Sequence, residues 1–204
     1  MRTHDLETEL SGLARRLTGG ADGRAVMVAP VSEGAGASTV AAALAHAACR
    51  ETGRPTWIID LDFSANTQAS RAKLNCQAYA GELGGDRFWR VAPEGAGRLA
   101  LRRCEDAPVF ISEFQRKPGA VKRVTFHGSS AWWTRARQSC GLVLVDAPFG
   151  SAAAPALAAD LDGVILVADA RGSRRSEAER LTERIEEAGG RVLGVVVNRA
   201  PERR

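Results

Sequence analysis

Short apolar runs alternate with segments of helical composition along this chain, and the alternation restricts the folds open to it. Residues 24–29 and 56–62 are nearly continuous apolar runs, as in parallel strands that are covered on both faces of a sheet. Between them, residues 38–50 are dominated by alanine, the strongest helix former, and Gly53 and Pro55 follow as stop signals. This order predicts a strand, a helix and a second strand, which together form a βαβ unit.

The last third of the sequence repeats the alternation. Residues 141–146, 163–168 and 191–197 are further apolar runs, and residues 152–159 and 173–188 have helical composition. Repeated β and α segments with buried strands predict an α/β fold, with a doubly wound, mostly parallel sheet and helices on both faces. Ligands bind such sheets at the carboxyl ends of the strands, near the point where the strand order reverses.

Length and composition favour one domain. The chain has 204 residues, of which 45% are hydrophobic and 25% are charged, enough for one well-buried core. We therefore predict a single domain over residues 1–204. Within it, leucines at helical spacing predict an N-terminal amphipathic helix in residues 1–20, residues 68–138 form a variable middle region, and residues 200–204 are expected to form a frayed tail.

The middle region shows a less regular pattern. Ser129 or Ser130 is expected to cap a short helix that ends at Arg137. Trp132 and Trp133 on that helix are compatible with a base-stacking platform, but packing in and around the core is the more ordinary role. Apolar runs between prolines also predict short strands, at residues 88–91, 99–101, 109–111 and 121–126.

Hydropathy and charge favour a cytoplasmic protein. The longest apolar stretches are shorter than the roughly 20 residues that a transmembrane helix needs, and the acidic N-terminus is not typical of a signal peptide. We expect recruitment to the inner face of the membrane only through a partner. The net charge of +4 is mild and is carried mostly by arginine, because the only lysines are Lys73, Lys117 and Lys122.

The cysteines and histidines lack the spacing of a zinc site or a compact disulfide framework. We expect reduced, mostly buried thiols and histidines with structural or surface roles. These residues are Cys49, Cys76, Cys104, Cys140, His4, His46 and His127.

The loop at residues 30–37, which joins the first predicted strand to the alanine-rich helix, has the composition of a phosphate site. Its small residues allow consecutive backbone N–H groups to converge on an anion at the positive end of the helix dipole. The alternative is a tight turn followed by helix-capping hydroxyls. The residues placed to bind phosphate are Gly34, Gly36, Ala37, Ser38 and Thr39.

A hydroxyl and three carboxylates are placed to hold a metal ion. Ser38 stands where the hydroxyl of a phosphate loop coordinates magnesium. Asp60 and Asp62 end the second predicted strand, and Asp146 ends the strand that begins at residue 141. Each carboxylate alone would more often be a solvated strand end, but their joint placement at the carboxyl ends of strands predicts a magnesium site.

Four ordered segments resemble the MinD/ParA superfamily of P-loop ATPases. They are P-V-S-E-G-A-G-A-S-T-V, I-I-D-L-D, L-V-L-V-D-A-P and V-L-G-V-V-V-N-R. Within that superfamily they are most similar to the cytoplasmic domain of bacterial tyrosine autokinases that pair with polysaccharide co-polymerases. The resemblance covers residues 24–69 and 130–199. It implies a Walker A loop at residues 34–39, a second carboxylate motif at 60–62, a Walker B end at Asp146, an adenine-side strand end at Asn198, and ATP or ADP with Mg²⁺ as cofactor.

The sequence departs from the family pattern at the groups that do the chemistry. Ala37 stands where the family has the lysine that reaches the β- and γ-phosphates, and Ser32 stands where it has a second signature lysine. Loss of one such charge typically costs a factor of about 10²–10³ in rate. We therefore assign no catalytic residue, although an arginine such as Arg171 or Arg174 would be able to approach from another loop. The autokinases' C-terminal tyrosine cluster is also missing, since the single tyrosine is Tyr79.

These features favour a catalytically impaired P-loop protein that is a regulatory or scaffold partner of an exopolysaccharide or capsule biosynthesis and export system. The resemblance implies a cytoplasmic segment of a membrane polysaccharide co-polymerase as partner, and self-association. One alternative is a weak ATPase or protein tyrosine kinase of the same system. A further alternative is a ParA-like positioning or DNA-binding protein, but the mild net charge makes nucleic acid a poor candidate. Nucleotide binding itself stays open, with no cofactor as the other possibility.

Overall fold

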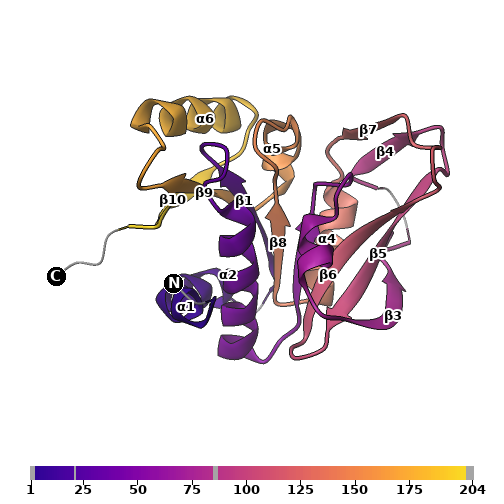
Figure 1. Cartoon of the computed structure of the whole chain (residues 1–204), viewed down its shortest axis with the longest axis horizontal. Helices are drawn as coiled ribbons and strands as arrows, with labels where there is room; N and C mark the ends of the chain where they lie inside the picture. Colours follow the sequence, from indigo (N-terminus) through magenta and orange to yellow (C-terminus); the bar gives the residue numbers. More distant parts are fainter. Residues whose placement is uncertain (1–2, 21, 85–86, 201–204) are drawn as a thin grey trace.

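An eight-stranded sheet organises the chain, in the order β10-β9-β1-β8-β2-β6-β5-β3 (Figure 1). The computed structural model describes residues 3–20, 22–84 and 87–200. Neighbouring strands from β10 to β6 are parallel, whereas β5 pairs antiparallel with both β6 and β3. The parallel strands are β1 (Arg24–Pro30), β2 (Thr56–Asp60), β6 (Val109–Arg116), β8 (Leu142–Asp146), β9 (Gly163–Asp169) and β10 (Val192–Asn198).

Helices cover both faces of this sheet (Figure 1). On one face α2 (Ala37–Thr52) packs on the strands and α1 (Thr3–Thr18) packs on α2. The other face carries α4 (Ser130–Ser139), the short α5 (Ala153–Leu157) with a 3₁₀ turn (Ala158–Asp160), and α6 (Arg175–Glu187). The predicted α/β class with a mostly parallel sheet and helices on both faces is confirmed.

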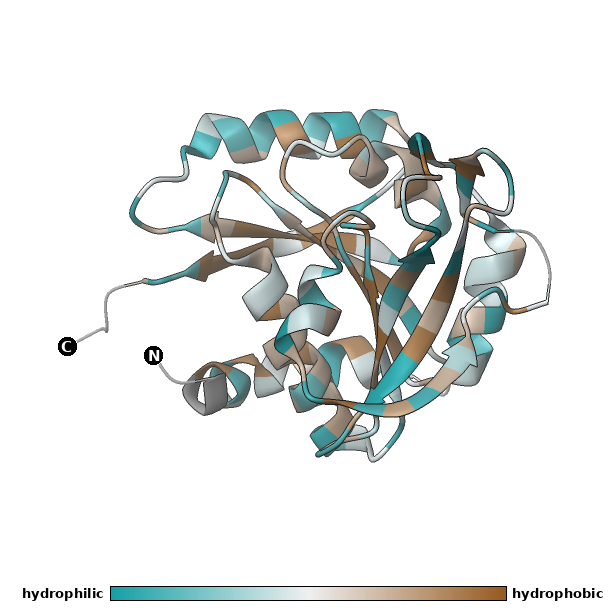
Figure 2. Ribbon diagram, turned by 45° about the vertical axis from the view of Figure 1, so that its right-hand side comes forward, coloured by the Kyte–Doolittle hydropathy of each residue, from teal (hydrophilic) through white to brown (hydrophobic). Residues whose placement is uncertain are grey.

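Alternation of side chains along the strands explains why the runs are apolar throughout. In β1, Val26 and Val28 belong to the core beneath α1 and α2, whereas Ala25 and Met27 belong to the core beneath α4. All four side chains are fully buried. Figure 2 shows the same contrast across the molecule, with apolar residues concentrated in the strands and polar residues along the outer side of α6.

The middle region contributes both to the main sheet and to a separate ribbon. Strands β3 (Leu74–Ala80), β5 (Gly97–Cys104) and β6 extend the main sheet, while β4 (Trp89–Ala92) pairs antiparallel with β7 (Arg123–Phe126). The four strands predicted here are confirmed, with β5 and β6 longer than expected. Strand β3 and the five-residue α3 (Thr67–Arg71) were not predicted, because an exposed edge strand has no apolar pattern and α3 is too short to show periodicity.

Two of the tryptophans in the middle region are core residues. Trp132 and Trp133 are 0% exposed, and both rings contact Phe88. The Trp132 indole N–H donates to the Gly81 carbonyl at 3.0 Å. The base-stacking alternative is therefore wrong, because neither ring is accessible to a nucleic acid.

The thiols agree with the prediction made from their spacing. All four cysteines are free; Cys49, Cys104 and Cys140 are buried and Cys76 is exposed. Among residues 3–20, 22–84 and 87–200, no helix combines the length and the apolar character that crossing a bilayer requires. Residues 201–204, the last four of the predicted frayed tail, lie outside the described residues.

Candidate functional site

Two glycines bend the loop between β1 and α2. Gly34 has φ of 71° and Gly36 has φ of 89°, both in the left-handed region that residues with a Cβ rarely adopt. The Ala35 N–H donates to the Ser32 carbonyl at 3.2 Å, and Val40 makes the first helical bond, to the Gly36 carbonyl at 3.0 Å. The loop therefore turns the chain from β1 directly into α2.

The N-terminus of α2 presents backbone amides without partners from its own helix. The first four N–H groups of any helix lack such partners, and within the described residues no side chain caps this end. Since α2 is 16 residues long, its dipole adds partial positive charge at Ala37, Ser38 and Thr39. An anion of the size of a phosphate fits this cradle.

Two carboxylates lie side by side at the ends of neighbouring strands. Asp60 of β2 is in register with Asp146 of β8, and the two residues are 2% and 3% exposed. The oxygens of Asp60 accept the Asp62 N–H at 2.9 Å and the Gln68 N–H at 2.8 Å. One oxygen of Asp146 accepts the Gln68 side chain, and the other, Oδ1, is buried and has no hydrogen-bond partner among the described residues.

Burial shifts the acidity of both groups. Desolvation raises the pKa of Asp60 to about 7; the amides of Gln68 and Asp62 oppose the rise, and the Asp146 carboxylate adds to it. Desolvation likewise raises the pKa of Asp146, opposed by hydrogen bonding from Gln68 and Ser38. These two acids therefore resist ionisation unless a cation or a donor compensates their charge.

Asp62 differs from the other two acids because its own loop satisfies it. Its Oδ1 accepts from the Ser64 N–H and hydroxyl and from the Ala65 N–H, and its Oδ2 accepts the Thr67 hydroxyl at 3.0 Å. Burial raises the pKa of Asp62, but these bonds outweigh it and leave that pKa lowered. Asp62 thus holds the turn that leads into α3.

Gln68 is the residue that sequence reasoning missed. It is 5% exposed, and its Nε2 donates to Asp146 Oδ2 at 2.6 Å and to the Ser38 carbonyl at 2.9 Å. It therefore joins the start of α3 to β8 and to the phosphate-loop helix. Its position shortly after the carboxylate motif is the only signal that the sequence offered.

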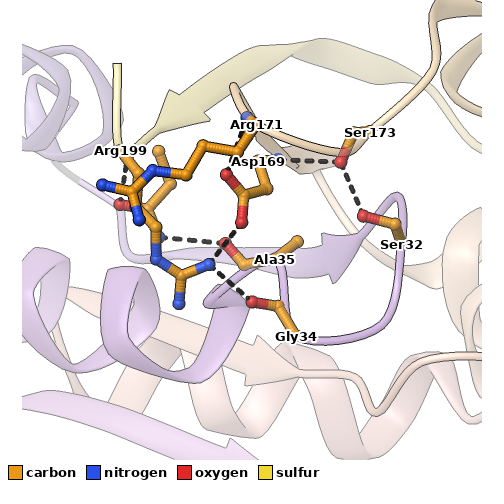
Figure 3. A network of polar contacts seen from close by, with 8 residues as sticks. Ser32, Gly34, Ala35, Asp169, Arg171, Ser173 and Arg199 are labelled. Carbon is orange, nitrogen blue, oxygen red and sulfur yellow. Dashed lines mark hydrogen bonds and ion pairs between the residues drawn. The ribbon is translucent and has the colours of Figure 1, made fainter. Parts of the chain in front are cut away.

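The end of β10 closes the loop from the opposite side (Figure 3). Asn198 is 8% exposed, and its Nδ2 donates to the Ala35 carbonyl at 2.9 Å. A Cβ at position 36 would lie 2.3 Å from that nitrogen, so only glycine fits there. Arg199 follows in the left-handed region, with φ of 55°, and its Nη1 donates to the Gly34 carbonyl at 2.9 Å.

Arg199 is the arginine that contacts the loop. Its guanidinium also pairs with Asp169 at the end of β9, whose other oxygen accepts the Arg171 N–H at 2.9 Å (Figure 3). The Ser32 and Ser173 hydroxyls are hydrogen bonded at 2.6 Å, which ties the start of the loop to the same segment. The two arginines considered from the sequence bond elsewhere: the Arg171 backbone N–H donates to Asp169, and the Arg174 backbone N–H donates to Glu177. Among the described residues, neither side chain forms a hydrogen bond or ion pair with the loop.

The three carboxylates are not arranged to hold a divalent metal between them. Asp60 and Asp62 use their oxygens within the chain, and one oxygen of Asp146 is bonded to Gln68. In the described part of the chain, no three His, Cys, Asp or Glu side chains are grouped so as to hold a metal ion. As they stand, these residues do not fit a metal ion held by the three acids.

One cavity adjoins the end of β1, and a second lies elsewhere on the molecule. One, of about 280 Å³, is lined by the ends of β1 and β8, by α6 and by Phe149. Another, of about 950 Å³, is lined by β4, the start of α4 and Asp160, and it includes none of the predicted site residues. We place the candidate site at the loop, because the amides, the buried acids and the strand ends converge there.

Comparison with known proteins supports the fold. No protein-family model matches the sequence, and no curated protein matches it significantly. The structure is similar to the VpsO kinase domain, with a TM-score of 0.67 and 17% identity over 98% of this chain and 97% of that one. It is also similar to the kinase domain of the Escherichia coli tyrosine kinase ETK, with a TM-score of 0.62 and 16% identity over 98% of this chain and 75% of that one.

A nucleotide-binding protein from Archaeoglobus fulgidus, solved with ADP, is a more distant likeness. Its TM-score is 0.53, with 18% identity over 96% of this chain and 71% of that one. At these identities the likeness establishes the fold alone. The predicted P-loop fold, of the kind seen in bacterial tyrosine kinase domains, is confirmed at that level.

Asp60→Asn is expected to remove a pH dependence from the stability of the protein. With a pKa of about 7 in the folded chain and a lower value when unfolded, Asp60 favours the fold while it is protonated, and this contribution is lost as the pH rises from about 4 to 7. The free energy of unfolding should fall by about 2 kcal/mol or more between roughly pH 5 and pH 8, measured by urea denaturation. Asp60→Asn should reduce that fall, and Asp146, whose pKa is also raised, contributes the remainder.

Asp62→Asn is the matched control, because the pKa of Asp62 is lowered and its contribution is lost toward acid pH. The fall between pH 5 and 8 should persist in that variant. An equal fall in Asp60→Asn and the native protein would contradict the assignment.

Proposed function

We propose that this protein is a catalytically impaired P-loop protein that acts through protein contacts, as a regulatory or scaffold partner of an exopolysaccharide or capsule biosynthesis and export system. The observation that carries the proposal is a strand-to-helix loop with the glycine turns expected of a phosphate loop but with no lysine in it. The glycine turns and the free amides of α2 are present, but Ala37 stands at the position of the lysine. Its methyl group is 5% exposed and packs into the core beneath α1 and α2.

The neighbouring positive charge does not replace the lysine. The Arg199 guanidinium donates to the Gly34 carbonyl and pairs with Asp169, so its charge is already matched within the chain. Groups aimed at the charge that develops in phosphoryl transfer are typically worth about 3–4 kcal/mol each. Without such a group, turnover should be slower by a factor of about 10²–10³ than in a lysine-bearing loop.

Binding of nucleotide is a separate matter from turnover. The α2 amides and dipole do not depend on the lysine, and they suit the phosphates of ADP or ATP. The fold likeness to a protein solved with ADP supports nucleotide binding by this fold. We place the phosphates at residues 34–39 and the adenine beside the end of β10, at Asn198.

The partner follows from the resemblance to tyrosine autokinases and from the likeness of the fold to tyrosine kinase domains. We propose that the chain, in the cytoplasm, docks on a cytoplasmic segment of a membrane polysaccharide co-polymerase and is held at the inner face of the membrane by it. Self-association of the domain is part of the same proposal.

One contact favours a second candidate function, a weak ATPase or kinase. Arg199 Nη1 lies 2.9 Å from the Gly34 carbonyl, so a rearrangement of this side chain would bring a cation to the loop. In that case turnover would depend on Arg199 as well as on Asp146.

Restoring the lysine should separate binding from chemistry. Ala37→Lys is expected to raise the affinity for ADP by about tenfold, because it adds a charge-assisted contact to phosphate. Fluorescent ADP titration measures this, with Ala42→Lys, farther along α2, as the matched control. Single-turnover assays of the native protein should show no ATP hydrolysis above that of Asp146→Asn.

Hydrolysis by the native protein that is abolished by both Asp146→Asn and Arg199→Ala would overturn the proposed impairment and favour the second candidate. Equal affinity of Ala37→Lys and the native protein would instead contradict the role given to the missing charge.

Association with the export system is testable in cells. Affinity purification of the tagged protein from the membrane fraction should recover a polysaccharide co-polymerase, and deletion of the gene should reduce polymer export. A complementing Asp146→Asn variant should restore export, because docking does not require turnover. No recovered co-polymerase together with unchanged export in the deletion strain would refute the proposal.

A further inference from the structure

Gln68 bonds to both residues that would have to hold the predicted metal ion. The ion would lie between the Ser38 hydroxyl and the Asp146 carboxylate. The Gln68 carboxamide nitrogen is 2.6 Å from Asp146 Oδ2 and 2.9 Å from the Ser38 carbonyl, so it already bridges these two elements. With 5% exposure it is held inside the protein, not displayed on its surface.

The Gln68 backbone fixes this side chain in place. Its N–H donates to Asp60 Oδ2 at 2.8 Å, at the end of the neighbouring strand β2. The residue before it, Thr67, donates its hydroxyl to Asp62. Both carboxylates therefore serve to anchor the start of α3, and α3 presents Gln68 to Asp146.

The nitrogen end of the carboxamide, which faces Asp146, opposes a cation there. The amide nitrogen has two N–H donors and no lone pair for a metal, whereas Mg²⁺ requires oxygen ligands in octahedral geometry. Both oxygens of Asp60, both of Asp62 and one of Asp146 accept hydrogen bonds from the chain. The remaining oxygen, Asp146 Oδ1, is a single buried carboxylate ligand.

We infer that Gln68 is a specificity-determining residue, which makes this site take the phosphates of a nucleoside di- or triphosphate without a divalent cation. The inference rests on the proposed nucleotide site and deepens it. The negative charge of the phosphates is then met by the α2 amides and by the dipole of that helix. Because neither a metal ion nor a lysine compensates a third phosphate, ADP binds at least as tightly as ATP.

Metal binding is measured first without nucleotide. Mn²⁺ is titrated against the native protein, Gln68→Glu and Gln68→Ala, with free Mn²⁺ followed by electron paramagnetic resonance. Gln68→Glu replaces the donor with a carboxylate of the same shape and should bind Mn²⁺ at least about tenfold more tightly than the native protein. Gln77→Glu, on the exposed edge strand β3, adds the same charge elsewhere and should leave Mn²⁺ binding unchanged.

Native binding of Mn²⁺ as tight as that of Gln68→Glu would overturn the inference. Gln68→Ala covers the case in which a buried glutamate prevents folding: it should also gain Mn²⁺ affinity, and failure of every folded Gln68 variant to do so would overturn the inference as well. Circular dichroism establishes which variants are folded.

Nucleotide affinity is measured next, by fluorescent ADP in Mg²⁺ and in EDTA. The native protein should show the same affinity within about twofold in both, whereas Gln68→Glu should bind more tightly in Mg²⁺ than in EDTA. Native affinity that rises tenfold in Mg²⁺ would overturn the metal-independent site. Absence of ADP binding in both conditions would refute the proposed nucleotide site itself, a result distinct from any outcome of the Mn²⁺ titration.

Discussion

The hydrogen bond from the Gln68 carboxamide to the buried Asp146 carboxyl is the contact on which the arrangement of the site depends. A carboxyl that is 3% exposed at the end of β8 needs either a cation or a donor, since burial raises its pKa. In this chain the need is met from inside, by a neutral amide at 2.6 Å. The same amide reaches the Ser38 carbonyl, so α2, α3 and β8 are joined at one point.

The loop itself is held by a second set of contacts from the opposite edge. Asn198 and Arg199 at the end of β10 bond to the carbonyls of Ala35 and Gly34, and Asp169 neutralises the arginine. These bonds use carbonyl groups of the loop and do not involve the amides at the start of α2. The result is an anion cradle preserved by packing and hydrogen bonding, in a chain that has no lysine before Lys73.

The fold could be predicted from the sequence because a parallel strand buried on both faces is apolar at consecutive positions, a pattern visible within a few residues. Runs such as residues 24–29 are apolar at every position because alternate side chains enter two different cores, and small residues in the loop follow from the left-handed angles at Gly34 and Gly36. Gln68 could not be predicted in the same way. Its role depends on α3, a helix of five residues, and on strand ends that come together only in three dimensions. Strand β3 was not predicted because it is an exposed edge strand, and an edge strand with few buried side chains shows no clear apolar pattern in the sequence.

The central claim is that this loop receives phosphate without the metal ion or the lysine of related folds. Anomalous diffraction at the manganese absorption edge, from crystals grown with ADP and Mn²⁺, tests it most directly. We expect electron density for the phosphates at the amides of residues 36–39 and no anomalous peak between Ser38 and Asp146. The Gln68 carboxamide should still be bonded to Asp146. A manganese peak at that position, with Gln68 displaced, would contradict it.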